Sequence, residues 1–230
     1  MLESIRLINK KIKFYQASSS ELFGDTTEKF QNEQSPFQPR SPYGCAKLFA
    51  FAITKNYREA YGIFASNGIL FNHESPRRSI NFVTRKVTSS FAKIRNNKLD
   101  CLEIGNLDAK RDWGYAKDFV EMIWKMLQHD KPDDFVIATG EVHSVRDMIE
   151  VVSKYFDYEI EWKGEGLNEI GIDKKTQNVL VRVNPNHFRP AEVSYLRGSY
   201  SKAENQLNWK PKTSFEELMH IMCEADARKF

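Results

Sequence analysis

Short apolar segments alternate with amphipathic segments along most of the chain, and this pattern restricts the fold more than any other feature. Strands are expected at residues 12–17, 63–71, 102–104 and 135–138. Helices are expected at residues 2–10, 42–61, 82–94, 116–127, 145–156, 200–207 and 215–227. Such alternation predicts α/β layers. Residues 164–184 are polar, and we expect them to form an irregular loop around one hairpin arm.

Length and composition exclude several classes of protein. A chain of 230 residues forms one large domain or two small ones, and its 41% hydrophobic residues can build a core. The mean hydropathy of −0.56 and the lack of a long apolar run predict no membrane-spanning helix. No signal peptide is recognisable. The net charge of +3 does not indicate nucleic-acid binding.

The cysteines and histidines indicate neither a metal site nor a disulfide framework. Cys45, Cys101 and Cys223 are odd in number and far apart, which fits a reducing, cytoplasmic location. The five histidines lack paired spacing such as H-E-x-x-H. We therefore predict that the protein holds no metal.

Tyr43 and Lys47 are spaced for joint chemistry. Pro42 suits the first turn of a helix, and positions i and i+4 of that helix share one face. A tyrosine with its usual pKa of about 10 is a poor base at neutral pH, and a nearby ammonium lowers that pKa. This spacing is common by chance, so for these two residues alone an ordinary helix is the favoured interpretation.

The segment upstream strengthens the catalytic interpretation. The expected strand at residues 12–17 runs into Ser18, Ser19, Ser20 and Glu21. If the backbone stays extended, Ser19 and Glu21 point the same way. Ligands of open α/β sheets bind beyond the carboxyl ends of the strands. A polar loop is the alternative, but together with Tyr43 these residues indicate a catalytic site.

Several long runs resemble one known family. They are FYQASSSEL at 14–22, NGILFNHESPRR at 67–78, GNLDAKRDWG at 105–114, DFVIATG at 134–140 and FRPAEV at 188–193. In this order they resemble the extended short-chain dehydrogenase/reductase family, and within it the GDP-mannose 4,6-dehydratases. The resemblance covers essentially the whole chain.

This resemblance implies the C-terminal part of a Rossmann-like parallel sheet with a smaller α/β substrate-binding domain. Residues 1–71 would belong to the NADP-binding domain, and residues 72–230 mainly to the nucleotide-sugar-binding domain, with segments near 107–140 returning to the sheet. The chain contains no G-x-G-x-x-G turn. We therefore expect it to begin inside the cofactor domain, with roughly 100 residues of that domain absent. A non-catalytic fragment or an associating subunit is the alternative.

The resemblance also implies a reaction. GDP-mannose would be converted to GDP-4-keto-6-deoxymannose with NADP, the first step of GDP-fucose synthesis. Tyr43 would take the proton of the sugar 4-hydroxyl, assisted by Lys47, which would also touch the nicotinamide ribose. Glu21 would remove the C5 proton and help water leave C6. Ser19 would hold the 4-oxygen in place of the usual threonine. Relatives form homodimers or homotetramers, without nucleic acid or membrane.

Glu21 and Ser20 rank the related activities. Epimerases of the superfamily usually carry an apolar residue at the position of Glu21, because they eliminate no water. Dehydratases of dTDP-glucose place an aspartate where Ser20 stands. GDP-mannose dehydratase therefore comes first, another nucleotide-sugar dehydratase second and an epimerase third.

Further binding residues follow from the resemblance alone. His73 and Arg78 resemble residues that contact NADP, although His73 could be a core histidine and Arg78 a solvated loop residue. Asn72 resembles a contact of the sugar or its diphosphate.

Three more residues resemble contacts of the substrate diphosphate or ribose, namely Arg111, Arg189 and Glu192; a guanidinium can fork onto two phosphate oxygens. Ser79 stands where the family usually has glycine, and Tyr115 where it commonly has histidine.

Overall fold

The computed structural model describes residues 1–26, 28–188 and 195–230. The chain forms two compact units. Unit 1 consists of residues 1–73, 111–142 and 193–212, and unit 2 of residues 74–110, 143–192 and 213–230.

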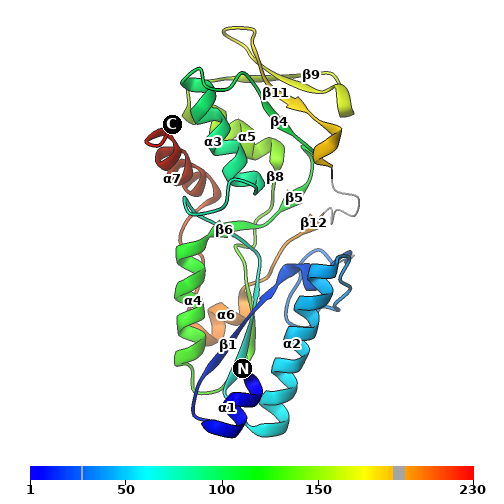
Figure 1. The fold of residues 1–230 in the computed structure, drawn as a ribbon, viewed down its shortest axis with the longest axis vertical. Helices are drawn as coiled ribbons and strands as arrows, with labels where there is room; N and C mark the ends of the chain where they lie inside the picture. Colours follow the sequence, from blue (N-terminus) through cyan, green and yellow to red (C-terminus); the bar gives the residue numbers. More distant parts are fainter. Residues whose placement is uncertain (27, 189–194) are drawn as a thin grey trace. The chain divides into compact units, whose positions relative to one another are not determined.

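Unit 1 holds a parallel sheet between helices (Figure 1). Its elements are α1 (Leu2–Ile8), β1 (Phe14–Ser19), the 3₁₀ helix η1 (Ser20–Leu22), α2 (Pro42–Tyr61), β2 (Ala65–Leu70), β6 (Trp113–Tyr115), α4 (Ala116–Gln128), β7 (Asp134–Ile137), β12 (Tyr195–Leu196) and α6 (Ser201–Leu207). The strands β3 (Asn72–Glu74) and β5 (Lys110–Arg111) contain residues of both units.

The sheet of unit 1 has the order β1-β2-β7 and is apolar on both faces. Ser18 pairs with Ile69, and Ile69 with Val136, all in parallel register. Ile69 and Val136 pack in one cluster with Phe51 of α2. The next residue along β2, Leu70, packs on the other face against residues of α4 and α6. Helices on both faces are typical of a Rossmann-like sheet, and this confirms the predicted fold class.

Helix α2 begins and ends where its sequence predicts. The Ser41 hydroxyl accepts the Gly44 N–H at 3.0 Å, and Pro42 occupies the first turn. Gly62 ends the helix in the left-handed conformation with φ +65°, which glycine adopts without steric cost. Both ends of this helix are thus fixed by local chemistry.

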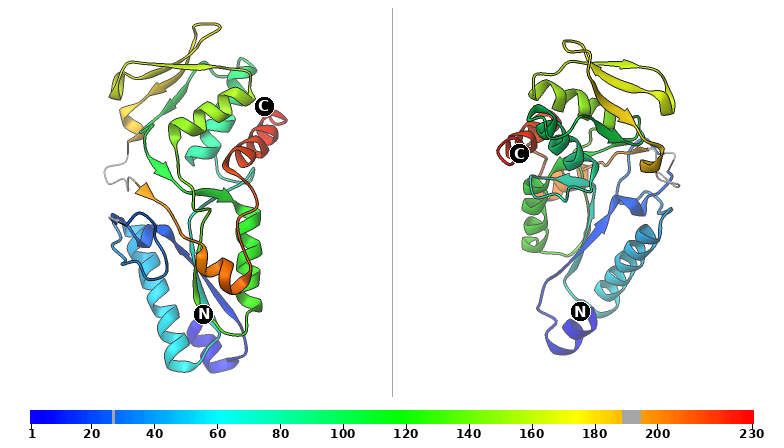
Figure 2. Two further views of the ribbon diagram at one scale, coloured as in Figure 1. Left: turned by 180° about the vertical axis from the view of Figure 1, so that it is seen from behind. Right: turned by 45° about the horizontal axis from the view of Figure 1, so that its top comes forward.

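Unit 2 combines a mixed sheet with three packed helices. Its elements are α3 (Val83–Arg95), β4 (Leu102–Ile104), β8 (His143–Ser144), α5 (Val145–Tyr155), β9 (Ile160–Lys163), η2 (Gly166–Asn168), β10 (Ile170–Asp173), β11 (Val179–Val183), η3 (Pro185–His187) and α7 (Phe215–Ala227). The sheet order is β4-β11-β10-β9, with β4 and β11 parallel and the other pairs antiparallel. Helices α3, α5 and α7 pack against one another, and Figure 2 shows them side by side.

The prediction of an irregular loop at residues 164–184 is wrong. This segment forms β10 and β11 as a hairpin, with the non-glycine residue Gln177 at φ +61° in the turn between them. Ile172, Leu180 and Val181 are buried. Residues 174–178 between the two strands are polar and exposed, and they lower the apolar content of the segment as a whole.

The other expected elements are present, with ends displaced by at most two residues. Within the described residues, no helix is long and apolar enough to cross a membrane.

Candidate active site

The sequence suggested that the backbone stays extended beyond the carboxyl end of β1, and in the structure it does not. The strand stops at Ser19, and residues 20–22 turn into η1. The Ser19 hydroxyl caps this turn by accepting the Glu21 N–H at 3.3 Å. Ser19 and Glu21 are therefore neighbours through a turn and not through the shared face of a strand. The expectation failed because a serine side chain can accept the backbone N–H of a residue in the following turn, and this stabilises the turn in place of extended backbone.

The start of α2 lies against this turn. A methyl group added to Gly44 would come within 2.9 Å of the Glu21 carbonyl oxygen, so the absence of a side chain permits the approach. The Gln38 N–H donates to the Leu22 carbonyl at 2.9 Å and fixes the intervening loop. The structure thus brings the turn that carries Glu21 and the helix that carries Tyr43 together within unit 1.

Tyr43 and Lys47 lie close on α2. The Lys47 ammonium is 5.5 Å from the centre of the Tyr43 ring and donates to the Ala17 carbonyl at 2.8 Å. The Tyr43 side chain is 54% exposed, so a ligand can reach its hydroxyl. Lys47 therefore connects the helix to the end of β1 while remaining beside the phenol.

His73 has one ring nitrogen fixed by its own backbone. Nδ1 lies 2.9 Å from the Phe71 carbonyl, which can only accept, so Nδ1 carries the proton. The ring stacks on Phe119 at 5.3 Å between centroids. A neutral His73 then presents Nε2 as an acceptor. Asn72 precedes it, half-buried, at the start of β3.

Arg78 of unit 2 is held on two sides. Its Nε lies 3.2 Å from Oε2 of the buried Glu74, and its guanidinium stacks on Phe82 at 3.5 Å from the ring centre. Nε is buried and, despite this ion-pair contact, makes no hydrogen bond among the described residues. This side chain is therefore neither loose nor fully solvated, and its outer donors can receive an anion.

The remaining predicted binding residues are less well placed by the structure. Arg111 is half-buried in β5 and makes polar contacts within the chain. Arg189 and Glu192 lie outside the described residues.

Asp112 is a buried carboxylate that the sequence analysis missed. It accepts the Thr139 N–H and hydroxyl at 2.9 and 2.7 Å, the Gly140 N–H at 2.9 Å and the Gly198 N–H at 3.3 Å. Burial raises its pKa to about 6, although these hydrogen bonds oppose the shift. Its only sequence signal is its place beside Arg111, which does not reveal partners so distant along the chain.

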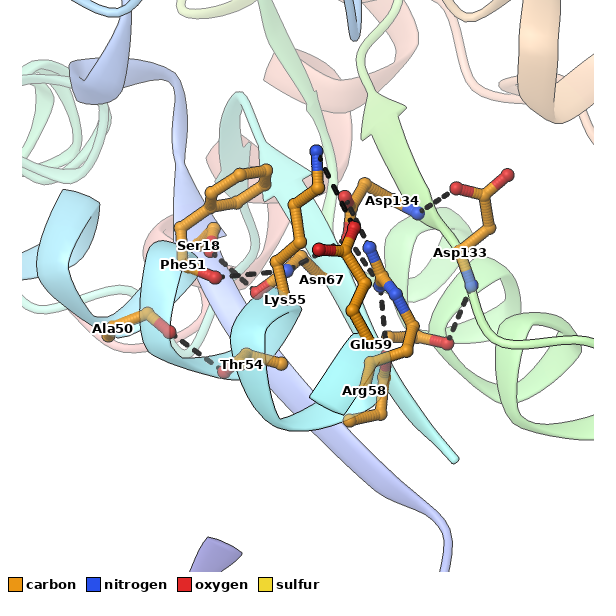
Figure 3. A network of polar contacts seen from close by, with 12 residues as sticks. Ser18, Ala50, Phe51, Thr54, Lys55, Arg58, Glu59, Asn67, Asp133 and Asp134 are labelled. Atoms are coloured by element: carbon orange, nitrogen blue, oxygen red, sulfur yellow. Dashed lines mark hydrogen bonds and ion pairs between the residues drawn. The ribbon is translucent and has the colours of Figure 1, made fainter. Parts of the chain in front are cut away.

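A buried polar network connects α2 to the sheet (Figure 3). The Arg58 guanidinium makes two 2.8 Å bonds to the Asp134 carboxylate, which also accepts the Asn67 amide at 2.8 Å. The Ser18 hydroxyl reaches the Asn67 oxygen at 3.4 Å. The network thus links the strand that ends at Ser19 with the helix that begins beside Tyr43.

The acidic, thiol and imidazole side chains of the described residues form no group of three or more that could hold a metal ion.

Comparison with known proteins identifies the family. The family model described as GDP-mannose 4,6 dehydratase matches residues 1–222. The chain belongs to this family. It is 56% identical over 228 residues to the GDP-mannose 4,6 dehydratase of Drosophila melanogaster, covering 98% of this chain and 58% of that protein. Its identity to the Homo sapiens enzyme is 57% over 220 residues, covering 96% of this chain and 59% of that protein. The chain thus spans about three fifths of the length of these relatives.

Solved structures of lower identity share the fold. RMD from Pseudomonas aeruginosa, complexed with NADPH, matches 99% of this chain and 70% of its own with a TM-score of 0.82 at 18% identity. The dTDP-glucose 4,6-dehydratase of Bacillus anthracis, in complex with NAD, matches 97% of this chain and 64% of its own with a TM-score of 0.80 at 17% identity.

Proposed function

We propose that this protein acts as a GDP-mannose 4,6-dehydratase, forming GDP-4-keto-6-deoxymannose by loss of water. The observation that carries the proposal is Glu21, held on a turn beside the Ser19 hydroxyl and against the start of the helix that bears Tyr43 and Lys47. A carboxylate here supplies the base that elimination requires and that epimerisation does not. Membership of the family supports the substrate.

Each of these side chains has a distinct task. Tyr43 accepts the proton of the sugar 4-hydroxyl, with the Lys47 ammonium 5.5 Å from the centre of its ring. Oxidation at C4 acidifies the C5 hydrogen, which Glu21 removes before it returns a proton to the leaving C6 hydroxyl. The Ser19 hydroxyl holds the 4-oxygen. Each positioned acid–base group typically contributes about 10²–10⁴-fold in rate.

The same proposal includes NADP as the cofactor. When bound, a nicotinamide supplies reversible oxidation and reduction at C4 and C6. The chemistry of the residues, taken within each unit, suits such a group. In unit 1 Lys47 can donate to ribose hydroxyls and His73 can accept at Nε2, and in unit 2 Arg78 carries Nη donors suited to phosphate. The similar solved structures were determined with NADPH and with NAD, which agrees with a dinucleotide.

The substrate would be held by residues of weaker support, namely Asn72, Arg111, Arg189 and Glu192. Residues 1–71 would serve the cofactor and residues 72–230 mainly the nucleotide sugar, with segments near 107–140 returning to the cofactor sheet. A homodimer or homotetramer, a cytoplasmic location and a role in GDP-fucose synthesis complete the proposal.

Two substitutions test the proposed roles of Glu21 and Tyr43. Both are made in a fusion of this chain with the part of the Drosophila relative that lies outside the aligned region. Glu21→Gln should lower product formation at least about 10²-fold while GDP-mannose still binds, because the amide cannot take the C5 proton. Glu59→Gln, an exposed site on α2, is the matched control. Product by chromatography is the measurement, and unchanged turnover would remove Glu21 from the mechanism.

Tyr43→Phe should suppress the first oxidation by a similar factor, since the ring remains and only the proton acceptor is lost. Tyr61→Phe at the other end of α2 is its control. Absorbance of reduced cofactor in a single turnover reports this step. Its normal appearance in Tyr43→Phe would contradict the role.

A further inference from the structure

A buried ion pair lies beneath the loop that carries Arg78. Arg85 of α3 donates from Nε to both carboxylate oxygens of Asp226 in α7, at 2.9 and 2.8 Å. Thr88 donates its hydroxyl to the same carboxylate at 2.7 Å. Asp226 is fully buried and the Arg85 side chain is 10% exposed. The pair thus joins helix α3 to helix α7.

The guanidinium of Arg85 also contacts the loop that carries Arg78. Its Nη1 donates to the carbonyl oxygens of Pro76 and Arg78, the latter at 3.2 Å. Between these carbonyls the chain turns, with the Arg78 N–H donating to the Ser75 carbonyl at 2.9 Å. Arg85 therefore holds the backbone on which the Arg78 side chain stands.

Two further residues, Glu74 and Phe82, contact the Arg78 side chain and orient its guanidinium. Glu74 contacts its Nε and is itself fixed by the Thr84 hydroxyl at 2.6 Å, while Phe82 covers one face of the guanidinium. A guanidinium held in this way loses little freedom when it binds an anion. Its Nη donors then meet the ligand in a fixed orientation.

We infer that Arg85 and Asp226 are positioning residues, which anchor residues 75–82 so that Arg78 presents its Nη donors to a phosphate of the nicotinamide dinucleotide. The inference rests on the proposed function for the identity of that phosphate. A purely structural ion pair is the competing explanation. The Arg58–Asp134 pair of unit 1 has the same chemistry and touches no part of this loop, so it provides a matched control.

The test is a double-mutant cycle on the ¹⁵N-labelled fusion with the unmatched part of the Drosophila relative, titrated with NADP⁺ and followed by NMR after circular dichroism has shown each variant folded. Arg78→Ala should weaken binding by about 10- to 100-fold, the range for a lost charge-assisted contact. Arg85→Lys keeps the charge but cannot reach both Asp226 and the two carbonyls, so about a fivefold weakening is expected. The double variant should bind no more weakly than Arg78→Ala alone.

Additive effects of Arg85→Lys and Arg78→Ala, or an equal loss in Arg58→Lys, would overturn the inference. Should Arg85→Lys fail to fold, Thr88→Val loosens Asp226 more mildly and should act in the same direction.

The Arg78 Nε–H signal separates this inference from the proposed function. Arg85→Lys should shift that signal and speed its exchange with water even without NADP⁺. An unchanged signal would overturn the positioning role. If Arg78→Ala leaves NADP⁺ binding unaltered, or the folded fusion binds none, the cofactor assignment fails and the Nε–H signal alone decides the inference.

Discussion

In unit 1, single carboxylates accept hydrogen bonds from backbone N–H groups that have no partner in a neighbouring strand. Asp112 collects N–H groups from Thr139, Gly140 and Gly198. Glu33 accepts the Val136 N–H at 2.7 Å on the outer edge of β7, the last strand of its sheet. Such bonds satisfy buried donors that would otherwise cost about 1–3 kcal/mol each.

Glu33→Gln should make the protein more stable at pH 7. Burial raises the pKa of Glu33, partly offset by the Val136 N–H, so folding favours its neutral form. The wild type therefore has its full stability below the unfolded-state pKa and loses part of it as pH rises through the folded-state pKa. Glutamine keeps the acceptor without the charge. Urea unfolding from pH 4 to pH 7 should show the advantage of the variant growing with pH.

Glu33→Ala is the control for that comparison. It removes the acceptor and should cost about 1–3 kcal/mol at every pH. A Glu33→Gln variant that is less stable than wild type at pH 7 would mean that the charge itself is favourable at this site.

At the scale of elements, local chemistry made helices easy to predict and the turn at residues 19–22 hard. Helix α2 has a capping serine, a proline in its first turn and a closing glycine, all visible in sequence. The turn at Ser19 depends on the approach of Gly44, which only the folded chain shows. The β10–β11 hairpin was missed because the polar, exposed turn at residues 174–178 outweighs its few buried apolar residues in a composition count.

Gly24→Ala should disrupt the turn that follows η1. Gly24 has φ +57°, and an added methyl would lie 1.7 Å from the Gln38 carbonyl oxygen. We expect a loss exceeding about 2 kcal/mol, beyond the 1–2 kcal/mol of left-handed strain alone. Gly166→Ala has the same φ of +57° with nothing within 4 Å, and should show the strain alone. Chemical denaturation of both variants gives the comparison, and equal losses would show that the loop at Gln38 yields freely.

For the whole molecule, the sequence predicted the α/β class and the grouping of Ser19, Glu21, Tyr43 and Lys47, whose positions lie within 29 residues of one another. It could not predict pairings between distant segments. Arg85 and Asp226 are 141 residues apart, and Arg58 and Asp134 are 76 apart. Sequence periodicity relates only residues that are close along the chain, so only the folded units reveal that these charged side chains form ion pairs.

The central claim is that these residues eliminate water from GDP-mannose, and the fate of the hydrogen at C4 tests it most directly. The fusion with the unmatched part of the Drosophila relative is given NADP⁺ and GDP-mannose deuterated at C4, and the product is examined by mass spectrometry and NMR. The account predicts a 4-keto-6-deoxy sugar that carries the deuterium at C6. A folded, NADP⁺-binding protein that returns only an epimer, or no product, would contradict it.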